Sequence, residues 1–136
     1  MDTIMLKLQR YERGVKMAEH EEQVALFNWA AYNVRKYPCL EYMFAIPNGG
    51  HRHISVAKKL KAEGVKAGVL DIMLPFASKR YHGLFIEMKF GRNKTTDQQN
   101  KYINHLTENK YCVAVCYNWE DAADVIKLYL SNGVIS

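Results

Sequence analysis

Glu87 and Lys89 lie in a segment that is otherwise suited to the interior of a protein. Residues 83–90 are mostly apolar or aromatic and are bounded by glycines, which is typical of a β-strand. Because side chains alternate along a strand, Glu87 and Lys89 point to one face. The opposite face is expected to belong to the core and carries Leu84, Ile86, Met88 and Phe90. A charged pair in such a strand is unfavourable unless a partner compensates it, and a divalent metal and a phosphate would do so.

A second apolar run, residues 69–74, carries a single charge in its middle, Asp71. Asp is rare in strands, and an isolated buried carboxylate is costly. Residues 76–82 form a turn between the two runs, so we expect an antiparallel hairpin that places Asp71 and Glu87 on adjacent strands. The alternative is simpler: Asp71 faces water on an edge strand, and the Glu/Lys pair faces solvent on a half-exposed strand.

Together these charges suit the hydrolysis of a phosphodiester. Two carboxylates are the hard oxygen ligands that Mg²⁺ or Mn²⁺ prefers. Such an ion makes water more acidic for attack on phosphorus. Lys89 can orient or deprotonate that water, or stabilise charge developing on the phosphate. An acid on the first helix, Glu19 or Glu22, could hold the ion through water from a third side, although matching of the helix dipole also explains these acids.

The bulk composition indicates one soluble α/β domain. The chain has 136 residues, with 19 Lys and Arg against 14 Asp and Glu, a net charge of +5 that suits a polyanion partner. Three cysteines do not make a disulfide framework, and no apolar run is long enough to cross a bilayer. The N-terminus has no secretory apolar region, so we expect a cytoplasmic protein of a bacterium or a phage-infected host cell, with no membrane partner.

Periodicity predicts the element order α-β-α-β-β-α-β-α, a mixed sheet flanked by helices. We expect an N-terminal arm or frayed helix over residues 1–17, a domain over 18–130 and a tail over 131–136. The predicted elements are a helix from 18 that Pro38 closes, a strand 41–46, a helix 56–63, strands 69–74 and 83–90, a helix 96–109, a strand 111–117 and a helix 119–130. The helix at 96 begins with a capping box, Thr96 and Gln99.

Basic residues cluster in three places that are suited to a DNA backbone. A glycine-containing loop carries Arg52 between two histidines and suits phosphate or base contact. The next helix presents a basic stripe, which is otherwise an ordinary solvated face, and a loop follows the Glu87 strand. The candidate nucleic-acid contacts are Arg52, Lys58, Lys59, Lys61, Lys66, Arg92 and Lys94.

The pattern resembles the PD-(D/E)XK, or restriction-endonuclease-like, superfamily and more closely its VRR-NUC branch of phage and DNA-repair nucleases, of the stand-alone type. The resemblance covers about residues 18–130, and the stretches together are specific in their order and spacing. They are EHEEQ at 19–23, NGGHR at 48–52, KAEGVKAGVLD at 61–71, GLFIEMK at 83–89, and Gln99 with Tyr102, Ile103 and Leu106.

The resemblance implies a restriction-endonuclease-like fold and a set of site residues. Asp71, Glu87 and the Met88 carbonyl would hold Mg²⁺ or Mn²⁺, and Lys89 would be the catalytic lysine. The family's first-helix glutamate corresponds best to Glu19, with Glu22 as a rival. Gln99 matches a recurrent glutamine that supports the site, although its capping role explains it equally well. One departure is Leu70, where the family usually has a proline that shapes the strand.

The resemblance further implies a homodimeric, metal-dependent DNA endonuclease that acts on branched DNA such as Holliday junctions, and a role in DNA repair. Two other functions remain open. One is a non-catalytic nucleic-acid-binding module that uses only the basic residues. The other is a hydrolase of small phosphorylated substrates. The acid pair argues against the first, because two carboxylates without a metal would repel DNA, and the few polar groups available for a closed pocket argue against the second.

Overall fold

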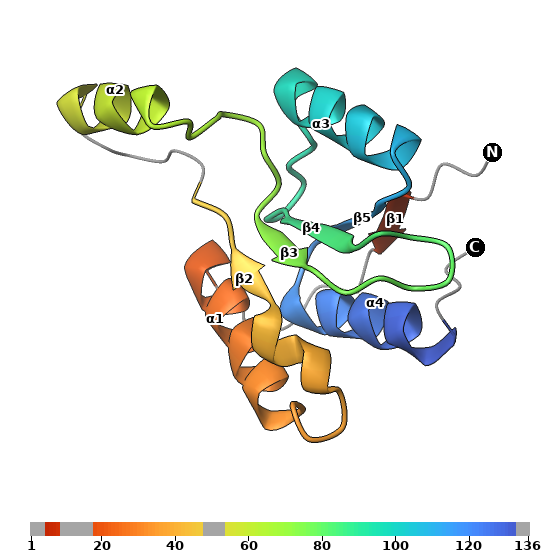
Figure 1. The fold of residues 1–136 in the computed structure, drawn as a ribbon. Coiled ribbons are helices and arrows are strands. Elements are labelled where there is room, and N and C mark those ends of the chain that lie inside the picture. Colours follow the sequence, from red (N-terminus) through yellow and green to blue (C-terminus); the bar gives the residue numbers. More distant parts are fainter. Residues whose placement is uncertain (1–4, 9–17, 48–53, 133–136) are drawn as a thin grey trace.

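A computed structural model of the chain describes residues 5–8, 18–47 and 54–132, and shows a five-stranded mixed sheet between two helical layers (Figure 1). The strand order is β1-β5-β4-β3-β2. The strands are β1 (Met5–Leu8), β2 (Phe44–Ala45), β3 (Ile72–Leu74), β4 (Leu84–Met88) and β5 (Cys112–Cys116). The helices are α1 (Glu19–Tyr32), the 3-10 helix η1 (Pro38–Tyr42), α2 (Ile54–Ala62), α3 (Asp97–Glu108) and α4 (Trp119–Asn132).

The centre of the sheet is the hairpin β3–β4 with β5 beside it. β3 and β4 pair antiparallel, with Ile72 opposite Ile86 and Leu74 opposite Leu84. β5 runs parallel to β4, because the connection between them crosses over through α3. The hairpin loop is fastened to α4, where the Tyr129 hydroxyl donates a hydrogen bond of 2.7 Å to the Phe76 carbonyl oxygen.

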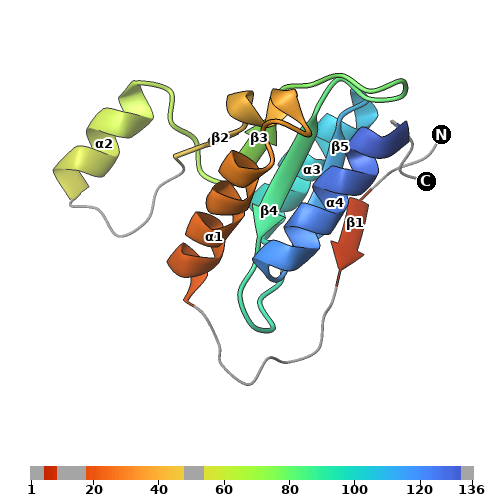
Figure 2. The same ribbon diagram turned by 90° about the horizontal axis from the view of Figure 1, so that it is seen from below.

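Each face of the sheet has its own hydrophobic cluster. α1 and α4 lie side by side on one face, and α3 covers the other (Figures 1 and 2). The alternation predicted for the 83–90 segment is confirmed over β4, whereas Phe90, expected on the core face, lies beyond the end of the strand and is only half-buried. Leu84, Ile86 and Met88 are buried in the α1–α4 cluster, and Phe85 packs in the α3 cluster. Glu87 therefore points to the α3 side of the sheet.

Four sequence-based boundaries are corrected. Residues 5–8, expected in an arm or frayed helix, form strand β1 and pair parallel with residues 113–116 of β5. The first helix ends at Tyr32 and not at Pro38, and the Asn33 side chain closes it by donating to the Trp29 carbonyl oxygen at 2.8 Å. Of the strand expected at 41–46, the first two residues belong to η1 and only the two residues of β2 form a strand. The last helix continues to Asn132, past the predicted boundary at 130.

The start of β3 also differs from the prediction, and this difference affects the site directly. Asp71 was expected in the middle of a strand, but β3 begins one residue later, at Ile72. Asp71 still belongs to the sheet edge, because its carbonyl oxygen accepts a hydrogen bond of 2.7 Å from the Ile46 amide. Because Asp71 lies just before the regular pairing of β3 with β4, its side chain can turn toward β4.

α2 stands apart from the rest of the domain (Figures 1 and 2). None of its nine residues is buried. Gly64 follows it with a left-handed backbone, φ = +98°, which is common for a glycine that ends a helix. In the part of the chain that the structure describes, no helix has the length and apolar character needed to cross a bilayer.

Candidate active site

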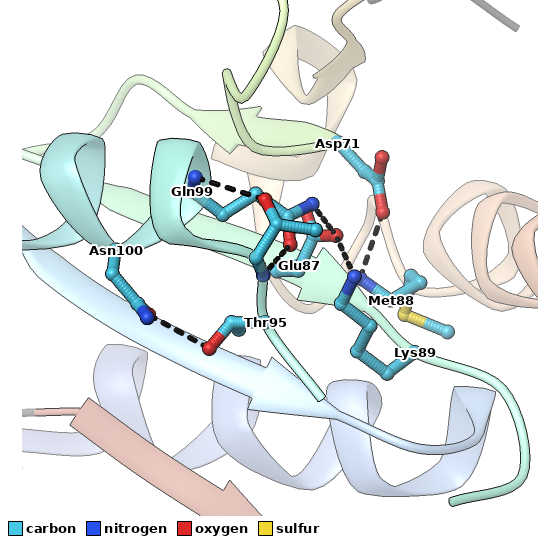
Figure 3. A network of polar contacts seen from close by, with 8 residues as sticks. Asp71, Glu87, Met88, Lys89, Thr95, Gln99 and Asn100 are labelled. Carbon is cyan, nitrogen blue, oxygen red and sulfur yellow. Dashed lines mark hydrogen bonds and ion pairs between the residues drawn. The ribbon is translucent and has the colours of Figure 1, made fainter. Parts of the chain in front are cut away.

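The β3–β4 register brings the two predicted acids together. Ile72 faces Ile86, so one further step along the hairpin sets Asp71 opposite Glu87. The Asp71 Oδ2 atom accepts a hydrogen bond of 2.8 Å from the backbone N–H of Met88 (Figure 3). This bond fixes the Asp71 carboxylate against the end of β4, next to Glu87. The two carboxylates predicted to share a site are therefore neighbours.

Glu87 is the most enclosed charged group of the site, with 2% of its surface exposed. Its Oε2 atom accepts a hydrogen bond from the Gln99 side-chain amide (Figure 3) and lies 3.5 Å from the Lys89 Nζ atom. Its Oε1 atom is buried and has no hydrogen-bond partner among the described residues. A buried carboxylate oxygen without a partner is unfavourable and calls for a cation or a proton.

The electrostatics of Glu87 agree with this geometry. Burial, together with the nearby charge of Asp71, raises the pKa of the Glu87 carboxyl from an ordinary 4.5 to about 8. The Lys89 ammonium and the hydrogen bonds from Lys89 and Gln99 act in the opposite direction but are outweighed. Two carboxylates held side by side, one of them buried, favour either a shared proton or a cation.

The donor set fits a small divalent cation. Carboxylate oxygens are the ligands that Mg²⁺ and Mn²⁺ prefer, and the unpartnered Glu87 Oε1 atom is a ligand position that the protein leaves open. Within residues 18–47 and 54–132, no three His, Cys, Asp or Glu side chains gather closely enough to hold a metal ion. An ion here would take two protein carboxylates and complete its shell with water or phosphate oxygens, as Mg²⁺ commonly does.

Lys89 follows directly after β4 and remains tied to the sheet. Its backbone N–H donates a hydrogen bond of 2.8 Å to the Cys116 carbonyl oxygen, so the β4–β5 pairing continues past the end of the strand. Its side chain is mostly enclosed, with 13% exposure, and extends along the same face as Glu87. The predicted common direction of Glu87 and Lys89 is confirmed (Figure 3).

Gln99 combines the two roles that the sequence offered as alternatives. Its Oε1 atom accepts a hydrogen bond of 2.9 Å from the Thr96 N–H, and its own N–H donates to Thr96 Oγ1 at 3.2 Å, which completes the capping box. The Nε2 atom at the other end of the same amide donates to Glu87 Oε2. Because the capping bond holds the amide oxygen of Gln99, the amide nitrogen and not the oxygen faces the Glu87 carboxylate.

The two candidate glutamates of α1 differ in their surroundings. Glu19 is the first residue of α1 and is exposed. Glu22 is buried, and its Oε1 atom accepts a hydrogen bond of 3.1 Å from the Trp119 N–H at the start of α4. Glu22 is thus engaged in joining α1 to α4. The structure does not gather Glu19 with Asp71 and Glu87 into a group of three acids.

The basic candidates lie on exposed elements. Lys58 and Lys61 lie on α2, and Lys59 beside them is also exposed. Lys66 follows α2, and Arg92 and Lys94 lie in the loop between β4 and α3; all three are exposed. Arg52 lies outside the described residues. The Met88 side chain is buried in the core, and its backbone N–H is bonded to Asp71.

Sequence comparison identifies relatives with the same arrangement of elements. The family model of the VRR-NUC domain matches residues 10–119, well over half of the chain. A solved structure of a VRR-NUC domain protein is 31% identical in sequence and superimposes with a TM-score of 0.71. That match covers 85% of this chain and 90% of the other. Among proteins with curated functions, none matches the chain significantly.

Proposed function

The chain belongs to the VRR-NUC domain family, a family of nuclease domains, and we propose that it is a divalent-metal-dependent DNA endonuclease. The restriction-endonuclease-like α/β fold predicted from the sequence is confirmed by the 0.71 TM-score to a VRR-NUC domain protein. Metal dependence, the residues that carry the reaction and the kind of DNA belong to the proposal.

The observation that carries the proposal is the pair of neighbouring acids, half-buried Asp71 and buried Glu87, with one Glu87 oxygen that has no hydrogen-bond partner among the described residues. A structural acid pair of this kind would be costly to keep, because the two charges repel one another and that of Glu87 is desolvated. A bound divalent ion would offset this repulsion, so the same pair is favourable in a metal site. A module that only binds nucleic acid has no use for two carboxylates at its phosphate-facing surface.

Asp71 and Glu87 would hold the ion, as their contacts indicate. The resemblance to the family adds the Met88 carbonyl as a further ligand and Glu19 as a residue that would act through water. When bound, Mg²⁺ or Mn²⁺ supplies a Lewis acid that activates water and neutralises phosphate charge. The Met88 N–H orients the Asp71 carboxylate, and Gln99 orients that of Glu87. Holding both carboxylates in one geometry is the main contribution of the protein to such a centre.

Lys89 provides the positive charge next to this centre. Its ammonium lies 3.5 Å from Glu87 Oε2 and is mostly shielded from solvent. A lysine in this position stabilises negative charge that develops on the scissile phosphate, or handles the proton of the attacking water. The exposed lysines and arginines around the site, together with Arg52, contact the phosphates of the flanking DNA.

The finer part of the proposal concerns the substrate and the assembly. We propose that the protein acts as a homodimer on branched DNA such as four-way junctions, in a DNA-repair setting. Two copies of one site related by a twofold axis suit a junction, which presents two equivalent strands for cleavage. Sedimentation velocity and cleavage of junction against linear duplex of the same sequence test these two points separately.

The activity is tested with Asp71→Asn and Lys89→Met on junction and linear DNA, in Mg²⁺ and in EDTA. Wild type should cut only with the metal, and each variant should be slower by at least about a hundredfold. A matched control is available on α4, where Lys127 and Asp124 form an exposed pair at 3.4 Å. Asp124→Asn and Lys127→Met should cut like wild type. Cutting by the site variants at wild-type rates would overturn the assignment.

A further inference from the structure

Gly68 lies three residues before Asp71, in the segment that leads from α2 into β3. Its backbone is left-handed, with φ = +86°, a conformation that favours glycine. Gly64 has a closely similar backbone, with φ = +98°. The two glycines therefore share one backbone requirement, and they differ in what surrounds them.

Gly68 is in very close contact with the first turn of α3. A Cβ atom at position 68 would lie 2.7 Å from Cβ of Gln98, 2.9 Å from its carbonyl carbon and 3.0 Å from its carbonyl oxygen. Real Cβ atoms essentially never come within 3.0 Å of another heavy atom. Two of these three atoms belong to the main chain of α3, so rotation of a side chain cannot relieve the clash. At Gly64, the same Cβ would meet nothing within 4 Å.

The segment has little freedom to move away from α3. Leu70, two residues after Gly68, is fully buried in the cluster that contains Ile103 of α3. A side chain at position 68 would therefore push against the first turn of α3 while Leu70 stays fixed beneath the helix. Gln99, the residue next to Gln98, would move with that turn.

The two segments that meet at Gly68, the Asp71 segment and the first turn of α3, are each hydrogen-bonded at or beside Glu87. On one side, Asp71 bonds to the Met88 N–H beside Glu87. On the other side, Gln99 donates to Glu87 Oε2. We propose that Gly68 is a positioning residue of the nuclease site: its missing side chain lets α3 seat against the Asp71 segment, so that Gln99 holds Glu87 facing Asp71. This inference rests on the proposed function for its consequence in metal binding.

The test compares Gly68→Ala with Gly64→Ala in the full chain. Both variants carry the strain of a left-handed alanine, but only the first adds the clash with Gln98. Gly68→Asn and Gly64→Asn form a second pair, because Asn tolerates this backbone better and so separates the contact from the strain. Folding is checked by circular dichroism.

Two readouts follow the site itself. The first is the NMR signal of the Gln99 side-chain amide in metal-free protein, which should shift in the Gly68 variants and keep its wild-type position in the Gly64 variants. The second is the affinity for Mn²⁺ alone, which should fall by about tenfold in the Gly68 variants only, as expected when a group that orients a ligand is displaced.

The inference is overturned if the Gly68 variants keep the Gln99 signal and the Mn²⁺ affinity of their Gly64 counterparts. It is also overturned if they fail to fold while the Gly64 variants fold, since Gly68 would then serve folding and not the site. Failure of the proposed function has a different signature. Wild type would bind no Mn²⁺ and cut no DNA, while the Gln99 signal would still report whether Gly68 sets its position.

Discussion

Glu87→Gln should make the metal-free protein more stable at alkaline pH. In the folded protein, burial and the charge of Asp71 raise the pKa of Glu87 from 4.5 to about 8. Between these two pH values the folded protein holds a proton that the unfolded chain has released. The free energy of unfolding from this group is therefore at its highest below pH 4.5 and falls as pH rises toward 8. Glutamine does not titrate, so the variant escapes this loss.

The size of the effect follows from the width of this pH window. From 4.5 to 8 is 3.5 pH units, and each unit changes the free energy of unfolding by about 1.4 kcal/mol per proton. The ceiling is therefore about 5 kcal/mol, and relaxation of the site reduces it. We expect Glu87→Gln to exceed wild type by about 1 to 5 kcal/mol at pH 8 and to match it near pH 5.

Urea unfolding in EDTA at pH 5, 6.5 and 8 measures this difference. The control variant is Asp124→Asn, which removes a carboxylate that is 42% exposed on α4 and should leave the pH profile close to that of wild type. Added Mg²⁺ should stabilise wild type at pH 8 and leave Glu87→Gln almost unchanged, because metal binding to the folded state raises stability by mass action. A wild-type profile parallel to that of Glu87→Gln would refute the electrostatic account of the site.

Two further predictions concern single contacts. Gln99→Ala should weaken Mn²⁺ binding by about 10–100-fold in calorimetric titration. Thr96→Ala should cost only about 0.5–2 kcal/mol of stability, because it removes the hydroxyl that caps α3 and leaves the Gln99 donor to Glu87 in place. Equal losses of Mn²⁺ affinity in the two variants would contradict the orienting role of Gln99. Replacing Lys58 and Lys61 by Gln should make DNA binding less dependent on salt. The slope of log binding constant against log salt concentration, measured by fluorescence anisotropy, should become shallower by about 0.9 for each lost phosphate contact. An unchanged slope would show that α2 does not contact the DNA backbone.

The central hairpin and its flanking elements could be predicted because their signals are local. Alternation over residues 83–90 identified both faces of β4 correctly. The capping box located the start of α3, and the apolar run at 111–117 contains β5. In each case, side-chain types within a few residues determine the structure, and no distant partner is needed.

The predictions from the sequence were wrong where contacts with residues far along the chain determine the local structure. β1 is four residues long, and its hydrogen-bonding partners on β5 are more than a hundred positions later. No pattern in the sequence of residues 1–17 predicts that pairing. The strand predicted at 41–46 is reduced to the two residues of β2, and its first two residues belong to η1. Pro38 is the first residue of η1 and not the end of α1. Tertiary context overrides propensity in such short segments.

The site was partly predictable for the same reason. The hairpin arithmetic alone brings Asp71 beside Glu87, and strand alternation adds Lys89. The double role of Gln99 could not be derived, because it requires both ends of one amide to be placed in space. The contact of Gly68 with Gln98 joins segments thirty residues apart and leaves no mark in the sequence beyond a glycine.

Diffraction from a crystal soaked in Mn²⁺, recorded at a wavelength where manganese scatters anomalously, tests the central claim most directly. We predict one strong peak between Asp71 and Glu87, within about 2.1–2.3 Å of oxygens from both carboxylates, and its loss in Asp71→Asn. A wild-type crystal with no peak there, or with manganese bound only elsewhere, would contradict the claim that this acid pair is a metal centre.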